Sequence, residues 1–227
     1  MDLRENYEEV RRNIREACLE AGRDPESVKL IAVSKTKPVS MIRDYYELGQ
    51  RDFGENHVQE IVQKSAEFPE ATYHMIGHLQ RNKVRQVVGK VEMIHSVDSL
   101  RLAEEISKES VKQGITSRIL IEINVGNEES KYGFSFEEAE DAARAFSPLP
   151  GIQVEGFMCV APYVSDPELN RPLFRKMYDL SVDIQSKNID NIQVKELSMG
   201  MTNDYRIAVS EGATIVRVGT ALFGSRV

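Results

Sequence analysis

Lys35 is the residue in this sequence whose position most directly suggests covalent chemistry by its amine. It closes an apolar run in the stretch LIAVSKTKP (30–38). Burial disfavours a charged ammonium, and a neutral amine can attack an aldehyde to form a Schiff base. The alternative is a rim lysine whose stem alone covers apolar surface. Lys37 is a rival amine, but it lies further into the turn and precedes Pro38, so Lys35 is favoured.

Two segments rich in glycine and hydroxyl residues suggest a phosphate site. They are LSMGMTND (197–204) and VRVGTALFG (216–224). Gly200 and Gly219 would allow the backbone to approach a ligand closely, and the hydroxyls of Ser198 and Thr220 would add donors. Ordinary turn chemistry explains either segment alone equally well. Because both follow late strands of the fold inferred below, where phosphate sites are common, the pair favours phosphate.

Arg217 lies inside the apolar run IVRVG (215–219). A guanidinium keeps its charge, so burial demands a partner. That partner is either a strand carboxylate, such as Glu122, Glu155 or Glu196, or a ligand acceptor such as a ring nitrogen. A reactive lysine, a phosphate cup and a buried arginine together suggest pyridoxal 5'-phosphate (PLP). Lys35 would then hold its aldehyde carbon, and Arg217 would donate to its pyridine nitrogen.

The elements that must position these groups alternate between short apolar runs and charged segments with helical periodicity. Eight runs are predicted as strands: 28–35, 51–56, 72–77, 91–97, 117–125, 152–160, 195–200 and 214–219. Helices are predicted over 2–22, 39–49, 57–67, 80–89, 98–113, 135–147, 167–187 and 203–211. Strand–helix alternation indicates parallel strands with helical crossovers, and about eight such strands fit a closed (β/α)₈ barrel. The segment 2–22 is an extra N-terminal helix.

An open doubly wound sheet is the alternative fold. However, the first predicted strand is not followed by the glycine-rich dinucleotide fingerprint, and the phosphate-loop motif does not occur. No linker or domain boundary interrupts the chain, so we expect a single domain over 1–227. In such a barrel the active site lies at the C-terminal ends of the strands. That edge carries Lys35, Asn56, His78, Met158, Ser198, Gly200, Arg217, Gly219 and Thr220.

Composition excludes several classes of function. The net charge of −7 argues against a nucleic-acid binder, which usually carries a basic face. No apolar run is long enough to cross a membrane, and the N-terminus has no apolar signal core, so we expect a cytoplasmic protein. Cys18 and Cys159 are too far apart in sequence to suggest a zinc site, and we interpret them as reduced thiols. The histidines show no metal-ligand spacing, and no metal site is predicted.

Several motifs resemble those of one known family. They are AVSKTKP (32–38), FGENHVQE (53–60), YHMIGHLQRNK (73–83), SKYGF (130–134), EGFMCVAP (155–162), LSMGMTND (197–204) and VRVGTALFG (216–224). This combination resembles the PLP homeostasis proteins, also called YggS/PROSC-type or alanine-racemase-like PLP-binding proteins, over nearly the whole chain. Three residues depart from the common pattern: Tyr73, Phe157 and Thr202, where tryptophan, leucine and serine are usual. These departures leave the lining of the pocket less defined.

The resemblance implies a barrel similar to the N-terminal domain of alanine racemase, with PLP held as a Schiff base on Lys35. It also implies roles for the remaining site residues: phosphate binding by Ser198, Gly219 and Thr220, a ring contact from Arg217, pocket lining by Asn56 and Met158, and a rim position for His78. A monomer is implied, as is a role in intracellular vitamin B6 balance without a firmly established enzymatic activity. PLP-dependent apoenzymes are the candidate recipients of the cofactor.

An amino-acid racemase of low activity is the alternative function. Racemisation usually needs acid–base groups on both faces of the substrate carbon. The resemblance to alanine racemase implies that this second base is a tyrosine, supplied across a dimer that involves a second domain. We expect no such domain within these 227 residues. An arginine at the ring nitrogen also opposes its protonation and weakens the electron sink. A Schiff-base aldolase that acts on a phosphorylated sugar is a third, less favoured hypothesis.

Overall fold

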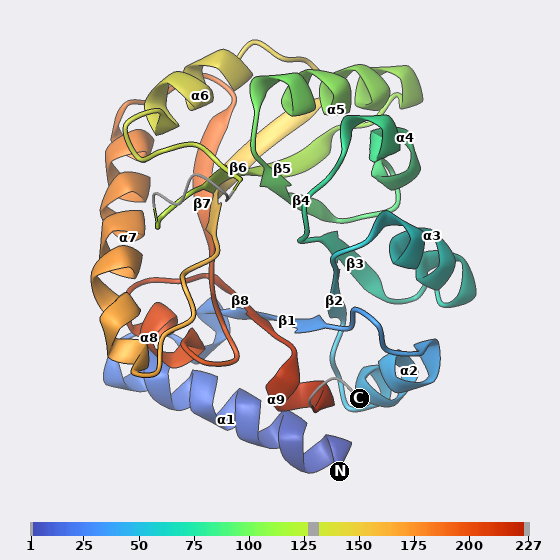
Figure 1. Ribbon diagram of the computed structural model, residues 1–227, viewed down its shortest axis with the longest axis vertical. Helices are drawn as coiled ribbons and strands as arrows, with labels where there is room; N and C mark the ends of the chain where they lie inside the picture. The colour runs from blue at the N-terminus through green and yellow to red at the C-terminus, as the bar shows by residue number, and fades with distance from the viewer. Residues whose placement is uncertain (1, 127–131, 225–227) are drawn as a thin grey trace.

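Eight parallel strands close into a barrel in the computed structural model, which describes residues 2–126 and 132–224. Each strand pairs with its neighbour in sequence, and the last pairs with the first (Figure 1). The strands are β1 (Lys29–Val33), β2 (Asp52–Glu55), β3 (Thr72–Met75), β4 (Met93–Val97), β5 (Ser117–Ile123), β6 (Ile152–Cys159), β7 (Ile192–Met201) and β8 (Ile215–Val218). The (β/α)₈ barrel predicted from the alternation of strands and helices is therefore confirmed.

Helices surround this barrel as an outer layer (Figure 1). They are α1 (Leu3–Glu20), α2 (Val39–Glu47), α3 (Val58–Glu67), α4 (Val84–Val87), α5 (Leu100–Gln113), α6 (Ala139–Phe146), α7 (Arg171–Ser186), α8 (Tyr205–Ser210) and α9 (Thr220–Phe223). The described residues also form three short 3-10 helices, η1 (Pro25–Ser27), η2 (Arg81–Lys83) and η3 (Pro167–Asn170). None of the helices in the described part of the chain is long and apolar enough to cross a membrane.

The apolar core has two parts because parallel strands in such a barrel are covered on both faces. The larger part lies mainly between the strands and the helices. A smaller cluster is formed by residues of five different strands: Ile31, Met93, Leu120, Met158 and Ile215. Since these strands are not all neighbours, their side chains meet within the barrel, which is thus a packed core rather than a pore.

Helix α1 is the extra N-terminal helix that the sequence predicts. Its apolar positions at spacings of three and four, among them Val10 and Ile14, are buried. The helix packs against α8 and α9, and the side-chain amide of Asn6 donates to the carbonyl oxygen of Leu222 at 2.9 Å. In Figure 1 it lies along the outside of the barrel, next to α8 and α9. It therefore packs on the two helices that follow the last two strands.

Several element boundaries differ from the prediction. The predicted helix 135–147 begins only at Ala139, although Ser135 and Glu138 form the expected reciprocal capping hydrogen bonds within the preceding turn. The segment 80–89 forms the 3-10 turn η2 followed by the short α4. Strand β7 is longer than predicted, and α9 was not predicted because four residues show no periodicity. Strand β1 ends at Val33, so Lys35 lies in the turn that follows it.

Candidate functional site

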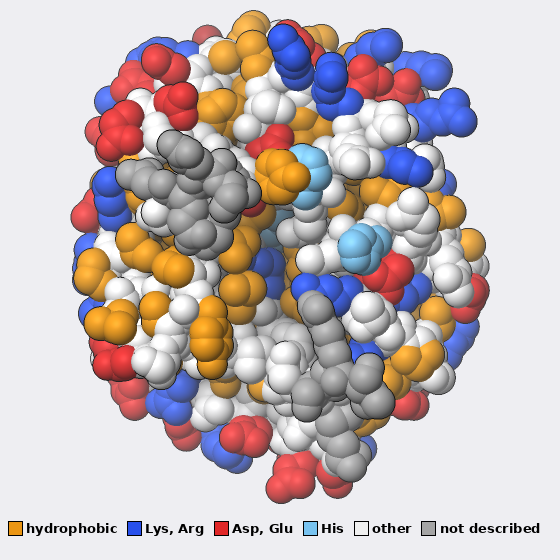
Figure 2. All heavy atoms as spheres, in the orientation of Figure 1, with side chains coloured by type: hydrophobic (Ala, Val, Ile, Leu, Met, Phe, Trp, Pro, Cys, Tyr) orange, Lys and Arg blue, Asp and Glu red, His pale blue; other side chains and the backbone are white. Residues whose placement is uncertain are grey.

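A cavity of about 290 Å³ opens where strands β1, β7 and β8 end. Its lining includes four of the nine site residues expected from the sequence, Lys35, Arg217, Gly219 and Thr220, together with Lys37 and Thr202. The face of the molecule seen in Figure 2 is hollowed near its centre, and Lys or Arg side chains lie in that hollow. The fold thus brings residues from both ends of the chain into one basic cavity.

The turn that carries Lys35 is held from below by a buried ion pair. Lys64 on α3 donates to the carbonyl oxygen of Ser34 and to the Glu55 carboxylate, both at 2.8 Å. The Ser34 hydroxyl donates to the same carboxylate at 2.6 Å. Burial raises the pKa of Glu55, although Lys64 and Ser34 oppose that shift. Because these groups are almost inaccessible to solvent, the position of Ser34 is fixed immediately before the reactive lysine.

The residue after Lys35 is also fixed, in an uncommon conformation. Thr36 has a φ of 64°, which a β-branched residue adopts only under constraint. Its backbone N–H donates to the Glu60 carboxylate at 2.7 Å, and Glu60 in turn pairs with Lys64. The turn is therefore anchored on both sides of Lys35, whose half-buried side chain lines the cavity.

The rival amine, Lys37, has a structural contact. Its Nζ donates to the carbonyl oxygen of Phe223, at the end of α9, at 3.1 Å. That contact ties the turn after β1 to the end of the last helix. Both amines line the cavity.

The loops after β7 and β8 meet at the cavity through Thr202 and Gly219. The backbone N–H of Gly219 donates to the Thr202 hydroxyl at 3.3 Å. Gly219 has a φ of −116°, and a Cβ there would be 3.4 Å from the Cβ of Val33. Neither its conformation nor its close neighbours therefore demand a glycine. A missing side chain at this position leaves room for a ligand against the backbone, as a phosphate site requires.

Ser198 and Gly200, which the sequence places at the phosphate, are not among the residues that line this cavity. Ser198 is fully buried, with its hydroxyl in contact with Arg217 and His95. Gly200 has a φ of 91°, and a Cβ there would lie 2.5 Å from the Cβ of Ala208 on α8. The pairing of β7 with β8 shifts register between Ser198 and Met201, so simple alternation along the strand did not reveal that Thr202 faces the cavity.

Arg217 is 3% exposed and lines the cavity from β8. Its guanidinium donates to the Ser198 hydroxyl at 2.6 Å and to the carbonyl oxygen of Cys159 at 2.7 Å. Burial lowers the pKa of Arg217, but a guanidinium remains charged in proteins. Because both contacts are with neutral acceptors, no carboxylate among the residues that the structure describes is bonded directly to this positive charge.

The strand carboxylates considered as partners of Arg217 have other roles. Glu155 pairs with Arg118, and Glu196 accepts a hydrogen bond from Thr214. Glu122 acts on Arg217 only through its charge. Burial, with the charge of Asp98, raises the pKa of Glu122 to about 7. None of these three carboxylates, all within the described residues, is therefore the direct hydrogen-bond partner of Arg217.

The remaining predicted site residues lie outside the cavity. Met158 belongs to the apolar cluster within the barrel. Asn56 and His78 line a second pocket, together with Lys83. The Nδ1 atom of His78 lies 2.9 Å from Asp98, and its ring stacks on Tyr132 with 3.7 Å between ring centroids. Of the SKYGF motif, Ser130 and Lys131 lie outside the described residues.

The histidines form no metal cluster in the described ranges 2–126 and 132–224. In those ranges, no group of three or more His, Cys, Asp or Glu side chains could hold a metal ion. His74 and His95 contact each other instead, with 3.1 Å between Nδ1 of His74 and Nε2 of His95. Sequence reasoning missed this contact because the two residues lie on different strands, 21 positions apart.

Comparisons with known proteins agree with this combination of barrel and cavity. The family model described as "Alanine racemase, N-terminal domain" matches residues 6–227. A protein of Aquifex aeolicus named pyridoxal phosphate homeostasis protein is 42% identical over 228 residues, which cover 100% of this chain and 99% of that protein. The chain belongs to the alanine racemase N-terminal domain family and, within it, to the pyridoxal phosphate homeostasis proteins.

Solved structures support the same assignment. A protein from Bifidobacterium adolescentis superposes with a TM-score of 0.92 at 35% identity, covering 97% of this chain and 94% of that one. PipY of Synechococcus elongatus PCC7942, solved with PLP bound, superposes with a TM-score of 0.81 at 37% identity. That match covers 93% of this chain and 100% of PipY. The barrel fold expected from the resemblance is thus shared over almost the full length.

Proposed function

We propose that this chain binds PLP in the cavity of Lys35 and Arg217 and acts in intracellular PLP homeostasis. One observation carries the proposal: the amine of Lys35, the guanidinium of Arg217, the hydroxyls of Thr202 and Thr220 and the backbone of Gly219 line a single cavity. These are the groups that an aldehyde, a pyridine nitrogen and a phosphate would need. When bound, PLP supplies an aldehyde carbon that condenses with an amine, and a ring that can withdraw electrons.

Each group has a role that follows from its place. Lys35 is the proposed covalent tether, because its turn is anchored on both sides. Thr202, Gly219 and Thr220 would hold the phosphate, and Arg217 would donate to the ring nitrogen. Asn56 and His78 stay in the proposal as rim residues, and Met158 as part of the packed barrel beneath. Ser198 would act through Arg217, and Gly200 through its packing on α8.

A carrier role is favoured over catalytic turnover. The curated relatives are named for PLP homeostasis, and PipY has been solved with PLP bound. An arginine facing the ring nitrogen would keep that nitrogen unprotonated, which weakens the ring as an electron sink. We further propose that residues 1–227 act as a single-domain monomer in the cytoplasm. PLP-dependent apoenzymes are the proposed recipients.

Racemisation of low activity is a second candidate, which one observation favours. Tyr163 lines the same cavity and is 86% exposed, so it could supply an acid–base group beside Lys35. An assay of alanine racemisation with PLP-loaded protein separates the two candidates. The carrier proposal expects no turnover above background, and robust turnover that is lost in Tyr163→Phe would establish the enzyme instead.

Binding itself is tested by titrating purified protein with PLP and recording its visible absorption. We expect saturable binding with a spectrum distinct from free PLP, which is lost in Lys35→Ala and kept in Lys37→Ala. Lys37→Ala is the matched control because that amine lines the same cavity. Absence of binding by the wild-type chain would overturn the proposed function. Loss of binding only in Lys37→Ala would assign the covalent attachment to Lys37 instead of Lys35.

A further inference from the structure

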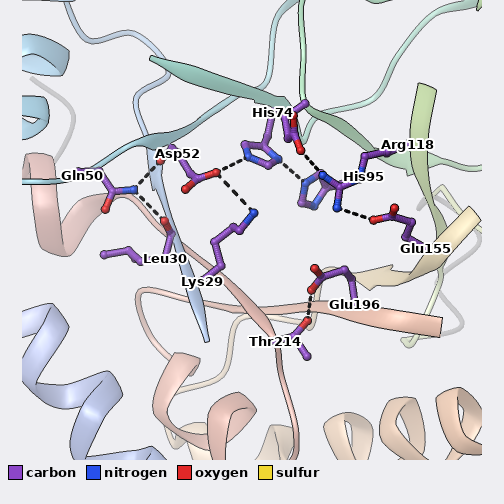
Figure 3. A network of polar contacts seen from close by, with 11 residues as sticks. Lys29, Leu30, Gln50, Asp52, His74, His95, Arg118, Glu155, Glu196 and Thr214 are labelled. Atoms are coloured by element: carbon purple, nitrogen blue, oxygen red, sulfur yellow. Dashed lines mark hydrogen bonds and ion pairs between the residues drawn. The ribbon is translucent and has the colours of Figure 1, made fainter. Parts of the chain in front are cut away.

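A chain of buried polar side chains crosses the barrel and ends at Arg217. The Ser198 hydroxyl lies 2.6 Å from the Arg217 guanidinium and 2.9 Å from Nδ1 of His95. The chain continues through His74 to the carboxylate of Asp52, with 2.9 Å between Nε2 of His74 and Oδ1 of Asp52. Figure 3 shows this second half, with the His74 and His95 rings in line between Asp52 and the barrel interior.

The five members come from β8, β7, β4, β3 and β2, so only the closed barrel assembles them. Ser198, His74 and His95 are each 0% exposed. Beyond Asp52, Lys29 lies 3.7 Å away and is partly exposed. The chain therefore runs from a partly solvated ion pair to a cavity-lining cation. Buried polar chains of this kind are costly unless every member is satisfied, and each link here has a partner.

The two ends of the chain limit the direction of its hydrogen bonds. Arg217 can only donate. Burial alone would raise the pKa of Asp52, but the hydrogen bond from His74 and the charge of Lys29 outweigh it and lower that pKa. Asp52 is therefore an ionised carboxylate that can only accept. Between these ends, the Ser198 oxygen accepts from Arg217, and its own proton is available to Nδ1 of His95.

The histidine tautomers follow from this direction. Burial, with the charge of Arg217, lowers the pKa of His95 well below its usual value, so its ring is neutral. If Ser198 donates to Nδ1 of His95, the single proton of His95 is on Nε2 and is donated to His74. His74 then carries its own proton on Nε2 and donates it to Asp52. The opposite tautomer of His95 would require a doubly protonated His74.

We propose that Ser198, His95, His74 and Asp52 are positioning residues that orient the Arg217 guanidinium toward the cavity. The chain occupies one N–H of Arg217 with a neutral hydroxyl, and the Cys159 carbonyl occupies another. The cation is thereby oriented without a directly bonded carboxylate from residues 2–126 or 132–224, so its field remains available to a ligand acceptor. This inference rests on the proposed function only for the identity of that acceptor, the ring nitrogen of PLP.

The first test needs no cofactor. Long-range ¹H–¹⁵N spectra of the cofactor-free protein report the tautomer of each of its four histidines. We expect a neutral ring with its proton on Nε2 for His95, and a proton on the Nε2 of His74 that faces Asp52. A proton on Nδ1 of His95 would overturn the proposed direction of the chain.

The second test compares Ser198→Ala with Ser96→Ala, a matched change at a buried serine that instead donates to the Gly77 carbonyl. Each variant is titrated with PLP and with 1-deaza-PLP, which has carbon in place of the ring nitrogen. Ser198→Ala is expected to lose about tenfold or more in PLP affinity, the effect of one hydrogen bond to a charged group. Its affinity for the deaza analogue should change less than twofold relative to Ser96→Ala.

The outcomes are distinguishable. Equal losses for both ligands in Ser198→Ala would show a merely structural role and overturn the inference, as would retained PLP affinity. If wild-type protein binds neither ligand, the proposed function fails, and the positioning role is judged on the histidine tautomers alone. The same spectra decide the matter if Ser198→Ala does not fold.

Discussion

The amine of Lys64 lies 2.8 Å from the backbone oxygen of Ser34, the residue immediately before Lys35. A lysine on α3 that is 4% exposed thus helps to set the place of another lysine in the cavity. The first is held by two carboxylates and a carbonyl, whereas the second lines the cavity. The sequence shows two similar amines, and only the fold gives them different roles.

Replacing Lys64 should be strongly destabilising. Lys64→Met would leave the fully buried Glu55 carboxylate without its cation, and breaking a buried ion pair on one side costs about 3–5 kcal/mol. Urea unfolding followed by circular dichroism measures this loss. Lys108→Met is the matched control, because Lys108 is exposed on α5, and we expect a change within about 0.5 kcal/mol. A stability close to wild type in Lys64→Met would refute the anchoring role.

Thr202 should contribute to binding of the PLP phosphate rather than to binding of its pyridine ring. Thr202→Val keeps the shape of the side chain but removes its hydroxyl from the cavity. We expect about a tenfold weaker affinity for PLP and little change for pyridoxal, which lacks the phosphate. Isothermal titration with both ligands measures the difference, and Thr116→Val on the exposed turn before β5 is the control. Equal losses for the two ligands would place Thr202 away from the phosphate.

Stability should fall as pH rises toward neutrality because of Glu122. Its pKa is about 7 in the folded chain and near 4.5 when exposed, so the folded state holds the proton more tightly. Between pH 4.5 and about 7 the folded chain keeps Glu122 protonated, whereas the unfolded chain has released that proton. The free energy of unfolding therefore decreases with rising pH, by at most about 3 kcal/mol.

Glu122→Gln should remove this contribution, so the difference in stability between variant and wild type should widen from pH 4.5 to 7 and then level off. Urea unfolding across that range measures it. The exposed Glu137→Gln is the control and should leave the pH profile of the wild type unchanged. Parallel profiles for Glu122→Gln and wild type would contradict the raised pKa.

Gly200 should be required for packing rather than for ligand contact. In Gly200→Ala the new Cβ would meet the Cβ of Ala208 at 2.5 Å and would sit at a φ of 91°. Overpacking and backbone strain together should cost about 2–4 kcal/mol. Gly22→Ala is the control, with a φ of 67° and no heavy atom within 4 Å of the new Cβ. Thermal unfolding that showed equal losses in both would remove the packing argument.

The barrel was predictable because it depends on local patterns. Apolar runs and helical periodicity alternate clearly, and Lys35, Arg217, Gly219 and Thr220 follow from the rule that function lies at the strand ends. Ser198 and Thr202 could not be distinguished in this way. Which of them faces the cavity depends on the register shift between β7 and β8 and on the backbone at Gly200, neither of which is visible in residue types.

The interior polar chain was not predictable for a related reason. His74 and His95 look isolated in sequence, and their contact arises from the closure of the barrel. The partner of Arg217 was likewise left open between a carboxylate and a ligand. A neutral serine was not considered because hydroxyls in glycine-rich segments more readily suggest phosphate. Long-range contacts of this kind require the three-dimensional arrangement.

The central claim is that Lys35 tethers PLP, and borohydride reduction followed by peptide mass mapping tests it most directly. Protein incubated with PLP and then reduced should carry one cofactor adduct on the peptide that contains Lys35, with the modified residue located by fragmentation. Lys37, on the same peptide region, provides the internal comparison. An adduct on Lys37 or another lysine, or no adduct at all, would contradict the account.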